Sequence, residues 1–313
     1  MAGTRVAFLG PPGSFGEEAL LSQADLADGD LVWLPSMTDI LGEVDAGGVD
    51  LGFVAIENSI EGTVNSVIDA LVFDYHLLVQ REVLFEVTQN LLAPTGTALA
   101  DVRRVVSFPN ALGQCRRWVA DHLPGAEEVA ATSTSEAAHM VAEGMLGAGA
   151  AAIGSALAAK IHGLEVLVPH IEDHRENTTR FVVVAAPGPG RIPRPTGHDK
   201  TSVVCFQKSD EPGSLHAILG LFKAFDINLT KLESRPAKTG LGDYCFIIDF
   251  EGHIADEVVA DCLRDLHTSL AGVKYLGSYP AAGEHGAVIR RDAEERWRSA
   301  DAWVGGLRQW VSA

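Results

Sequence analysis

The sequence predicts an α/β protein with a two-lobed first domain and a smaller second domain of β-α-β-β-α-β order. Two observations lead to this prediction. Short apolar strands alternate with amphipathic helical stretches through the first 186 residues, and a different order of strands and helices follows a segment rich in proline and glycine. A length of 313 residues also favours more than one domain.

The first domain is expected to contain two similar series of elements. The first comprises strand 5–10, helix 17–23, strand 31–34, helix 38–45 with Ser36 as its N-cap, strand 50–56 and a helix through 64–72. A long extended stretch, 77–93, comes next. The second series comprises strand 104–107, helix 111–122, strand 128–131, helix 135–144 and strand 150–153. Two such series with an extended connection predict two lobes with a cleft between them.

A linker is predicted over 187–200, because four prolines and three glycines there disfavour both helix and central strand. The elements beyond it are strand 201–207, helix 214–225, strands 228–233 and 244–250, helix 256–270 and strand 273–278, the order of a ferredoxin-like unit. We therefore expect domains over 1–186 and 201–280, followed by a tail, 281–313. Apolar residues in the tail are spaced 4-3-4-3-4, which predicts a helix over 289–311 that packs against protein: Ala293, Trp297, Ala300, Val304, Leu307 and Val311.

Composition and charge exclude several classes of protein. Hydrophobic residues make up 47% and charged residues 21%, as in folded chains with a filled core. The net charge of −18 disfavours nucleic acid and anionic membranes as partners. No apolar run reaches membrane-spanning length and no secretory leader is visible, so a cytoplasmic location is expected.

The cysteines and the first glycine-rich turn carry further expectations. Cys115, Cys205, Cys245 and Cys262 are scattered, so we expect buried free thiols rather than disulfides or a metal site. Residues 10–15, Gly-Pro-Pro-Gly-Ser-Phe, close a strand and open a helix, and the N–H groups beside Ser14 could hold a carboxylate. The turn lacks the G-x-G-x-x-G pattern, so a dinucleotide site is not expected.

Three polar segments stand at strand ends or a strand start. Residues 57–63, Glu-Asn-Ser-Ile-Glu-Gly-Thr, follow a buried strand, where open α/β sheets place ligand sites; a capped turn using Ser59 or Thr63 is the alternative. Residues 107–115 repeat the scheme in the second series, with a proline at a helix start. Residues 177–181, Asn-Thr-Thr-Arg-Phe, precede an apolar strand, where β-branched threonine is also ordinary.

Together these segments resemble the prephenate dehydratase family over residues 5–280, most specifically through residues 57–63 and the triplet Thr179-Arg180-Phe181. The second domain resembles an ACT regulatory domain through Glu233-Ser234-Arg235-Pro236 and Pro212-Gly213-Ser214-Leu215. The resemblance implies a first domain similar to periplasmic binding proteins, conversion of prephenate to phenylpyruvate in phenylalanine biosynthesis, and no redox cofactor or metal. No chorismate mutase segment precedes residue 5, so the monofunctional form is expected.

The resemblance also implies roles for individual residues. It places Thr179 at the leaving hydroxyl as a hydrogen-bond donor, with Glu61 as a possible proton relay. Arg180 is a substrate ligand or, equally, a structural ion-pair partner. The residues expected around the substrate are Ser14, Asn58, Ser59, Thr63, Ser107, Gln114, Thr178, Arg180 and Phe181.

L-Phenylalanine is the effector that the ACT resemblance implies, bound where two domains of a homodimer or homotetramer pair. The residues expected to bind it are Gly213, Ser214, Leu215, Asn228, Glu233, Ser234 and Arg235. Two departures from the family pattern matter. Phe108 and Asn110 stand where the family usually has His and Gln, which changes the polar contacts that this loop can make. Gly-Ser-Leu-His at 213–216 replaces the usual Gly-Ala-Leu-Val, and the more polar effector pocket predicts weaker or less selective inhibition.

Two alternatives stay open. The same reaction on arogenate would yield phenylalanine directly and differs only in an amino group on the substrate. A non-catalytic two-lobed protein that binds small molecules would share the architecture.

Overall fold

The structure is a computed structural model that describes residues 3–238, 240, 243–282 and 287–310, with side chains described up to 282 and from 297. The chain forms two compact units. One consists of Met1–Ala70 and Val83–Val184, and the other of Leu71–Glu82 and Ala185–Ala313. Within the described residues, no helix combines the length and apolar character needed to cross a membrane.

The first lobe is a mixed sheet of strand order β2-β1-β3-β11-β5, with β4 paired to β3. β1 runs parallel to β2 and β3, whereas β11 runs antiparallel to β3. Its strands are β1 (Arg5–Leu9), β2 (Asp30–Leu34), β3 (Leu51–Asn58), β4 (Gly62–Thr63), β5 (Leu78–Glu86) and β11 (Thr178–Ala185). Its helices are α1 (Phe15–Leu21), α2 (Ala24–Ala27), α3 (Met37–Asp45), which Ser36 caps as predicted, and α4 (Asn65–Asp69).

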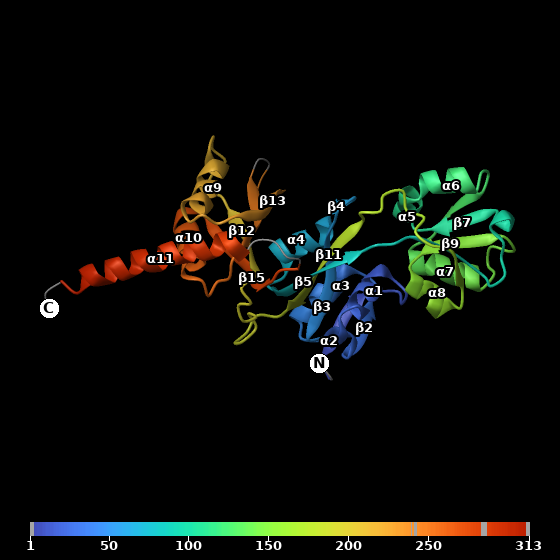
Figure 1. Ribbon diagram of the computed structural model, residues 1–313, viewed down its shortest axis with the longest axis horizontal. Helices are drawn as coiled ribbons and strands as arrows, with labels where there is room; N and C mark the ends of the chain where they lie inside the picture. Colours follow the sequence, from blue (N-terminus) through green and yellow to red (C-terminus); the bar gives the residue numbers. More distant parts are fainter. Residues whose placement is uncertain (1–2, 239, 241–242, 283–286, 311–313) are drawn as a thin grey trace. The chain divides into compact units, whose positions relative to one another are not determined.

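The second lobe is a five-stranded sheet of order β10-β6-β9-β7-β8, the green part of Figure 1. Its strands are β6 (Asn90–Ala93), β7 (Arg104–Ser107), β8 (Glu127–Ala130), β9 (Ala150–Gly154) and β10 (Glu165–Val168). Its helices are α5 (Pro109–Gln114), α6 (Arg116–His122), α7 (Thr134–Ala142) and α8 (Ala156–His162). Alternate strand residues face opposite sides, so Leu91 packs with α5 and α6, and Leu92 with α7 and α8.

Two extended stretches join the lobes, one between β5 and β6 and the other between β10 and β11. They lie side by side, because the Val87 N–H donates to the Asn177 carbonyl at 2.7 Å and the Ile171 N–H donates to the Gln89 carbonyl at 2.8 Å. The predicted pair of lobes is thus connected twice, and the polar segment 177–181 begins at one of these crossings.

The second domain has the predicted ferredoxin-like fold, with strand order β13-β14-β12-β15. Its elements are β12 (Asp199–Phe206), α9 (Ser214–Ala224), β13 (Leu229–Pro236), β14 (Tyr244–Glu251), α10 (Glu257–Ser269) and β15 (Gly272–Pro280). Side chains of α9 and α10, such as Phe222 and Leu266, pack on one face of this sheet against Val203, Ile248 and Phe250.

The segment Leu71–Glu82 groups with this second domain by its contacts, although it lies within the predicted range 1–186 and residues 78–82 begin β5 of the first lobe's sheet. The Lys274 ammonium donates to the backbone carbonyls of Val72 and Tyr75, at 2.9 and 2.8 Å. Lys200 pairs with the fully buried carboxylate of Glu82 at 2.8 Å. The contact-based units therefore differ from a division at the linker alone.

Helix 111–122, predicted as one element, is two helices, α5 and α6, that meet at Cys115. The break is stabilised from a distant part of the chain, because the Asp173 carboxylate accepts the N–H groups of Arg117 and Trp118 at 3.0 and 3.1 Å. The prediction also missed α8 and β10. α8 has little amphipathic contrast, and its capping by Ser155 is the clearer local signal.

Two predicted helices differ at their ends. The predicted helix through 64–72 is α4 followed by a π-helical turn, Ala70–Asp74. The tail helix is α11 (Ala287–Arg308), which contacts α10 through a hydrogen bond of 2.8 Å from the Trp297 indole to Asp261. Of the predicted stripe, the Ala293 side chain and Val311 lie outside what the structure describes. Trp303 and Trp310 are 67% and 81% exposed, so α11 presents indoles to solvent.

Candidate active site

A cluster of polar side chains forms where the end of β3 pairs with the start of β11. The antiparallel register places Thr179 opposite Asn58 and Arg180 opposite Glu57. The register then shifts, so Phe181 lies opposite Ala55. Such a β-bulge re-aims the side chains beside it, and bulges are common next to active sites.

Asn58 holds the centre of the cluster. Its amide nitrogen donates to Thr179 Oγ1 at 2.8 Å and to Asn177 Oδ1 at 2.7 Å. Its Oδ1 accepts the backbone N–H groups of Ile60 and Glu61 at 2.9 and 3.0 Å. Thr179 is 8% exposed, so its hydroxyl lies in a largely desolvated position.

Ser59 ties the 57–63 segment to the strand that carries Thr179. Its hydroxyl donates to the Glu176 carbonyl and accepts the Thr178 N–H, both at 2.9 Å. Its backbone N–H donates to the Thr178 carbonyl at 2.9 Å. Thr63 pairs with Glu57 in the short β3–β4 ladder. Segments that are more than one hundred residues apart are therefore joined at the predicted site.

The second lobe contributes Gln114, the last residue of α5. Its Nε2 donates to Glu61 Oε1, and its Oε1 accepts from Asn177 Nδ2 and Gln89 Nε2, each at 3.1 Å. The predicted residues Asn58, Glu61, Gln114 and Thr179 thus belong to one hydrogen-bonded network that spans both lobes.

Asn177 and Gln89 take part in this network without having been predicted as site residues. They are 1% and 2% exposed. The signal in the sequence is weak: Asn177 begins the polar segment 177–181, and Gln89 lies between Thr88 and Asn90 in the extended stretch 77–93. Such residues must find hydrogen-bond partners when they are buried.

Arg180 and Phe181 are held by contacts of their own. The Arg180 guanidinium lies 3.7 Å from the Glu57 carboxylate, so the ion-pair alternative is present in the structure. The Phe181 ring stacks on Phe53 with centroids 4.8 Å apart and is 5% exposed. Phe181 therefore packs in the core of the first lobe, beside Phe53 of β3.

Ser14 and Ser107 are engaged outside the network. The Ser14 hydroxyl donates to the Leu9 carbonyl at 2.9 Å and accepts the Glu17 N–H at 3.1 Å as the N-cap of α1. The Gly13 N–H donates to the chain's own Glu17 carboxylate at 2.5 Å. Ser107 is fully buried and donates to the Ile153 carbonyl at 2.7 Å. These hydroxyls serve local structure, which the residue types alone do not distinguish from ligand binding.

The turn at 10–13 also forms contacts between the lobes. The Ser155 hydroxyl donates to the Gly13 carbonyl at 2.9 Å, and the Ser135 hydroxyl donates to the Pro12 carbonyl. Beside them, burial and the neighbouring His139 lower the pKa of His162. Near Gln114, burial raises the pKa of the Cys115 thiol, and Asp173 and Glu172 add to this effect. Across the described ranges, no three His, Cys, Asp or Glu side chains are grouped as metal ligands are.

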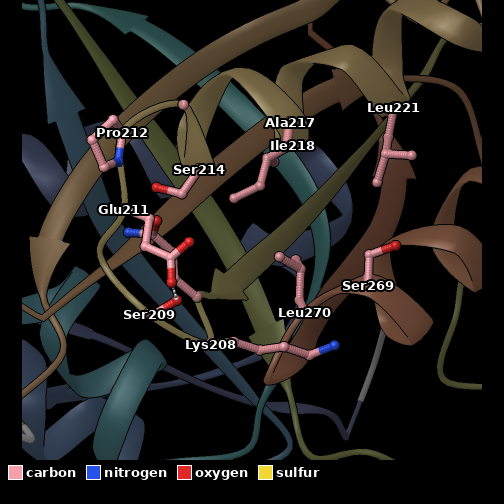
Figure 2. Close-up of a pocket in the computed structure, with 12 residues that line it drawn as sticks. Lys208, Ser209, Glu211, Pro212, Ser214, Ala217, Ile218, Leu221, Ser269 and Leu270 are labelled. Atoms are coloured by element: carbon pink, nitrogen blue, oxygen red, sulfur yellow. Dashed lines mark hydrogen bonds between the residues drawn. The ribbon is translucent and has the colours of Figure 1, made fainter.

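A pocket of about 420 Å³ opens in the second domain at the N-terminus of α9 (Figure 2). Gly213, with φ of +92°, precedes the helix, and Ser214 begins it. Polar groups line one part of the pocket, where the Ser209 hydroxyl donates to Glu211 at 2.8 Å. Its apolar wall consists of Ala217, Ile218, Leu221 and Leu270.

Of the predicted effector residues, Gly213 and Ser214 line this pocket and the other five do not. Leu215, expected beside the ring of the effector, packs on the core of the domain together with Ile218 and Leu221. Residues 214, 217, 218 and 221, which line the pocket, follow the helical repeat along one face of α9. Asn228 donates to Glu251 at 3.2 Å. On β13, Ser234 is exposed, and Glu233 lies between Lys231 and Arg235, at 3.5 and 3.8 Å.

Comparison with known proteins agrees with this geometry. The prephenate dehydratase family model matches residues 6–189, and the ACT domain model matches residues 201–268. A prephenate dehydratase of Mycolicibacterium vanbaalenii is 41% identical over 317 residues, covering 97% of this chain and 98% of the relative.

Solved structures extend the likeness to the whole fold. Prephenate dehydratase from Arthrobacter aurescens, in complex with L-Phe, is similar with a TM-score of 0.90 and 38% identity, over 98% of this chain and all of the other. A protein described as a novel type of quorum quenching acylase is similar with a TM-score of 0.80 and 30% identity, over 89% and 98%. One architecture thus carries differently described activities, whereas the family models and the relatives agree: the chain belongs to the prephenate dehydratase family.

Proposed function

We propose that this chain converts prephenate to phenylpyruvate, carbon dioxide and water, with the Thr179 hydroxyl as the donor to the departing hydroxyl group. The observation that carries this proposal is the 2.8 Å hydrogen bond from Asn58 to Thr179, which joins the two most specific family segments at one point. A hydroxyl fixed in a largely desolvated position is suited to stabilise charge that develops on a leaving oxygen.

The reaction needs little from the protein beyond positioning. The bond between the ring and its carboxylate breaks, and carbon dioxide leaves. The electron pair of that bond enters the ring, the bond to the opposite hydroxyl breaks, and the hydroxide gains one proton to become water. Aromatisation of the ring supplies the driving force. The protein must bind two carboxylates, donate to the leaving oxygen and keep water from the leaving carboxylate.

The residues of the network take roles that suit these needs. A threonine hydroxyl is a poor acid, so Thr179 acts as a positioned hydrogen-bond donor rather than a titrating group. Gln114 is the neutral donor for a substrate carboxylate, because its NH₂ group gives one hydrogen to Glu61 and has a second. Asn58 and Ser59 use their side-chain hydrogens within the network and hold the 57–63 segment in place. Glu61 lies at the edge of the network, where it relays a proton to the departing hydroxide.

Neutral donors suit a doubly negative substrate on this chain. The net charge of the chain is −18, which repels a doubly negative substrate. A site built from oriented neutral amides adds no further negative charge to this repulsion. The cation nearest Thr179 along the strand, Arg180, is paired with Glu57 and offsets that carboxylate.

Turnover of prephenate, followed by the absorbance of phenylpyruvate, tests the function directly. We expect activity in wild type, undiminished by chelation, and more than 10²-fold less in Thr179→Ala. Arogenate in place of prephenate tests the first alternative, and an acyl-amide substrate tests the activity described for the acylase neighbour. Binding of prephenate without turnover would favour the non-catalytic alternative.

We propose further that L-phenylalanine binds the second domain and inhibits the reaction. The Arthrobacter aurescens relative is described with L-Phe, and the pocket of Figure 2 offers helix N–H groups for a carboxylate and an apolar wall for a ring. Asn228 and the β13 residues would serve a ligand held between two paired domains of a homodimer or homotetramer. The chain acts in the cytoplasm, where the phenylalanine it helps to supply is used.

Calorimetry with L-phenylalanine tests the effector site. We expect wild type to bind, Ala217→Trp to lose binding because the indole fills the pocket, and Asn228→Ala to bind more weakly. Sedimentation of the same samples gives the oligomer. Normal binding by Ala217→Trp would move the site away from this pocket.

A further inference from the structure

Four side-chain amides, all buried or half-buried, form a chain that ends at Thr179: those of Gln89, Gln114, Asn177 and Asn58. We propose that Asn177 is a positioning residue that sets the direction of the hydrogen bonds in this chain. Through Asn58 it makes the Thr179 oxygen an acceptor and directs the Thr179 hydrogen toward the substrate. This role rests on the proposed function and assigns a residue outside the predicted site.

The orientation of the Asn58 amide is set by the backbone. Its Oδ1 accepts two N–H groups, those of Ile60 and Glu61, and backbone nitrogens cannot exchange that role. The Nδ2 group must therefore point the other way, and its two hydrogens go to Asn177 and Thr179. One end of the chain thus has a fixed direction.

The opposite end is set by a carboxylate. Glu61 Oε1 accepts the hydrogen bond, so the Gln114 group 3.1 Å away is its NH₂. Gln114 Oε1 then faces inward and accepts from Asn177 and Gln89. This end is in the second lobe, and its direction is fixed independently of Asn58.

Asn177 is the residue that both directions require. Its Oδ1 accepts from Asn58 and its Nδ2 donates to Gln114, so a flipped amide would set two donors and two acceptors against each other. It is 1% exposed, so water cannot repair such a mismatch. Its backbone carbonyl also accepts the Val87 N–H at 2.7 Å, which holds it between the two crossings that join the lobes.

The consequence for Thr179 is a defined donor. Its oxygen accepts the hydrogen from Asn58, so its own hydrogen cannot point along that line and is left for another acceptor. The structure gives this hydrogen no acceptor within the part of the chain that it describes. The leaving hydroxyl of the substrate is an acceptor of the required chemistry. A threonine with the opposite polarity would instead accept from the substrate and stabilise no negative charge.

Two substitutions at 177 separate positioning from packing. Asn177→Leu keeps the volume and removes both hydrogen bonds, so Asn58 loses one of its two acceptors and its amide is no longer held toward Thr179. We expect kcat to fall about 10- to 100-fold, because small misplacements of a reacting group lower the rate by such factors, and KM to stay within about three-fold of wild type.

Asn177→Asp keeps an oxygen for Asn58 but presents a second oxygen and a negative charge to Gln114. We expect its kcat to return to within about five-fold of wild type, while KM rises because Gln114 is displaced from Glu61.

Asn90→Leu is the matched control. Asn90 is a 4% exposed asparagine of the same unit, and its amide donates to the backbone carbonyls of Thr88 and Gly154, outside the chain of amides. We expect it to lower the melting temperature about as much as Asn177→Leu and to leave kcat within about three-fold. Equal kcat losses in both leucine variants, an Asn177→Leu enzyme with near-normal kcat, or an Asn177→Asp enzyme as slow as the leucine variant would each overturn the role.

A second measurement needs no substrate. Exchange of the Asn58 side-chain amide hydrogens, followed by nitrogen-15 spectroscopy, should be slow in wild type and Asn177→Asp and fast in Asn177→Leu. Fast exchange in wild type would overturn the positioning role even if the enzyme is active. A wild type that shows slow exchange but no turnover of prephenate would contradict the proposed function alone.

Discussion

Two regions of this protein hold buried polar groups in different ways: the network at Thr179 in the first unit, and the contacts of the segment Leu71–Glu82 in the second. In the first, neutral amides surround Thr179 and each is oriented by its neighbours. In the second, charges are neutralised directly. Glu82 is fully buried, pairs with Lys200 at 2.8 Å and also accepts the Ala282 N–H at 2.8 Å. Lys274 is bound by two backbone carbonyls of the segment Leu71–Glu82.

The difference follows from what each region must do. A site for a doubly charged substrate has to direct hydrogen bonds without presenting full charges that would compete with or repel the ligand. A segment that has to remain attached is held well by buried ion pairs, because detachment would separate the pair and leave a buried charge without its partner. Under the proposed function, oriented amides therefore serve chemistry, and ion pairs serve attachment.

The largest expected effect separates chemistry from stability. Thr179→Ala should lower kcat about 10²- to 10³-fold, as loss of a transition-state donor does. The melting temperature should stay close to that of wild type, because one hydroxyl is removed and no charge is left unpaired. Thr179→Ser is the control and should retain much of the activity. An alanine variant that unfolds, or that keeps near-normal kcat, would contradict the assignment.

Removal of Glu82 should have the reverse outcome. Glu82→Ala leaves the Lys200 ammonium without its partner and should lower the free energy of unfolding by about 3 kcal/mol. Glu127→Ala removes a comparable carboxylate from an exposed pair with Arg104, and should cost ~0.5 kcal/mol. Urea unfolding of both variants measures the contrast. Equal losses would show that burial does not distinguish the two pairs.

A smaller effect concerns pH and the neutral core of the second domain. Burial, with a contribution from Cys245, raises the pKa of Cys205 from 9.0 to about 12. Above pH 9 the unfolded thiol loses its proton while the folded one keeps it, so the free energy of unfolding falls as pH rises toward 12. One such thiol contributes about 1.4 kcal/mol per pH unit in this window. Urea unfolding at pH 8 and pH 10 should show a smaller fall for Cys205→Val than for wild type, and parallel curves would refute the shift.

The smallest effect lies at the edge of the second unit. Trp297→Phe removes the hydrogen bond to Asp261 and should lower the free energy of unfolding by about 1 kcal/mol, with kcat unchanged. Trp303→Phe alters an exposed indole on the same helix and should change almost nothing. Truncation after Ala282 should then reduce stability at least as much as Trp297→Phe. Identical melting curves for full-length and truncated chains would show that α11 adds no stability.

Local patterns predicted most elements, and the structure joins four of the residues proposed for the site. Ser36 capped its helix as expected, and the order of elements in the second domain was correct from periodicity and the proline-rich linker alone. Asn58, Glu61, Gln114 and Thr179 share one network as the three polar segments suggested. The packing of Phe181 and Leu215 was not predicted, because which side of a strand or helix a residue occupies depends on a bulge or on the helical phase.

The amino-acid sequence by itself determined the fold class, the order of elements in the second domain and the family, because strand and helix periods, turn residues and two polar segments are properties of neighbouring residues. Tertiary structure alone decided the division of α5 from α6, the attachment of Leu71–Glu82 to the second domain and the place of Asn177. Each of these depends on partners that are brought together only by folding: Asp173 for α6, Lys274 for the attached segment, and Asn58 with Gln114 for the amide. Hydrogen-bond direction is set by such distant partners, so it cannot be read from a residue and its neighbours.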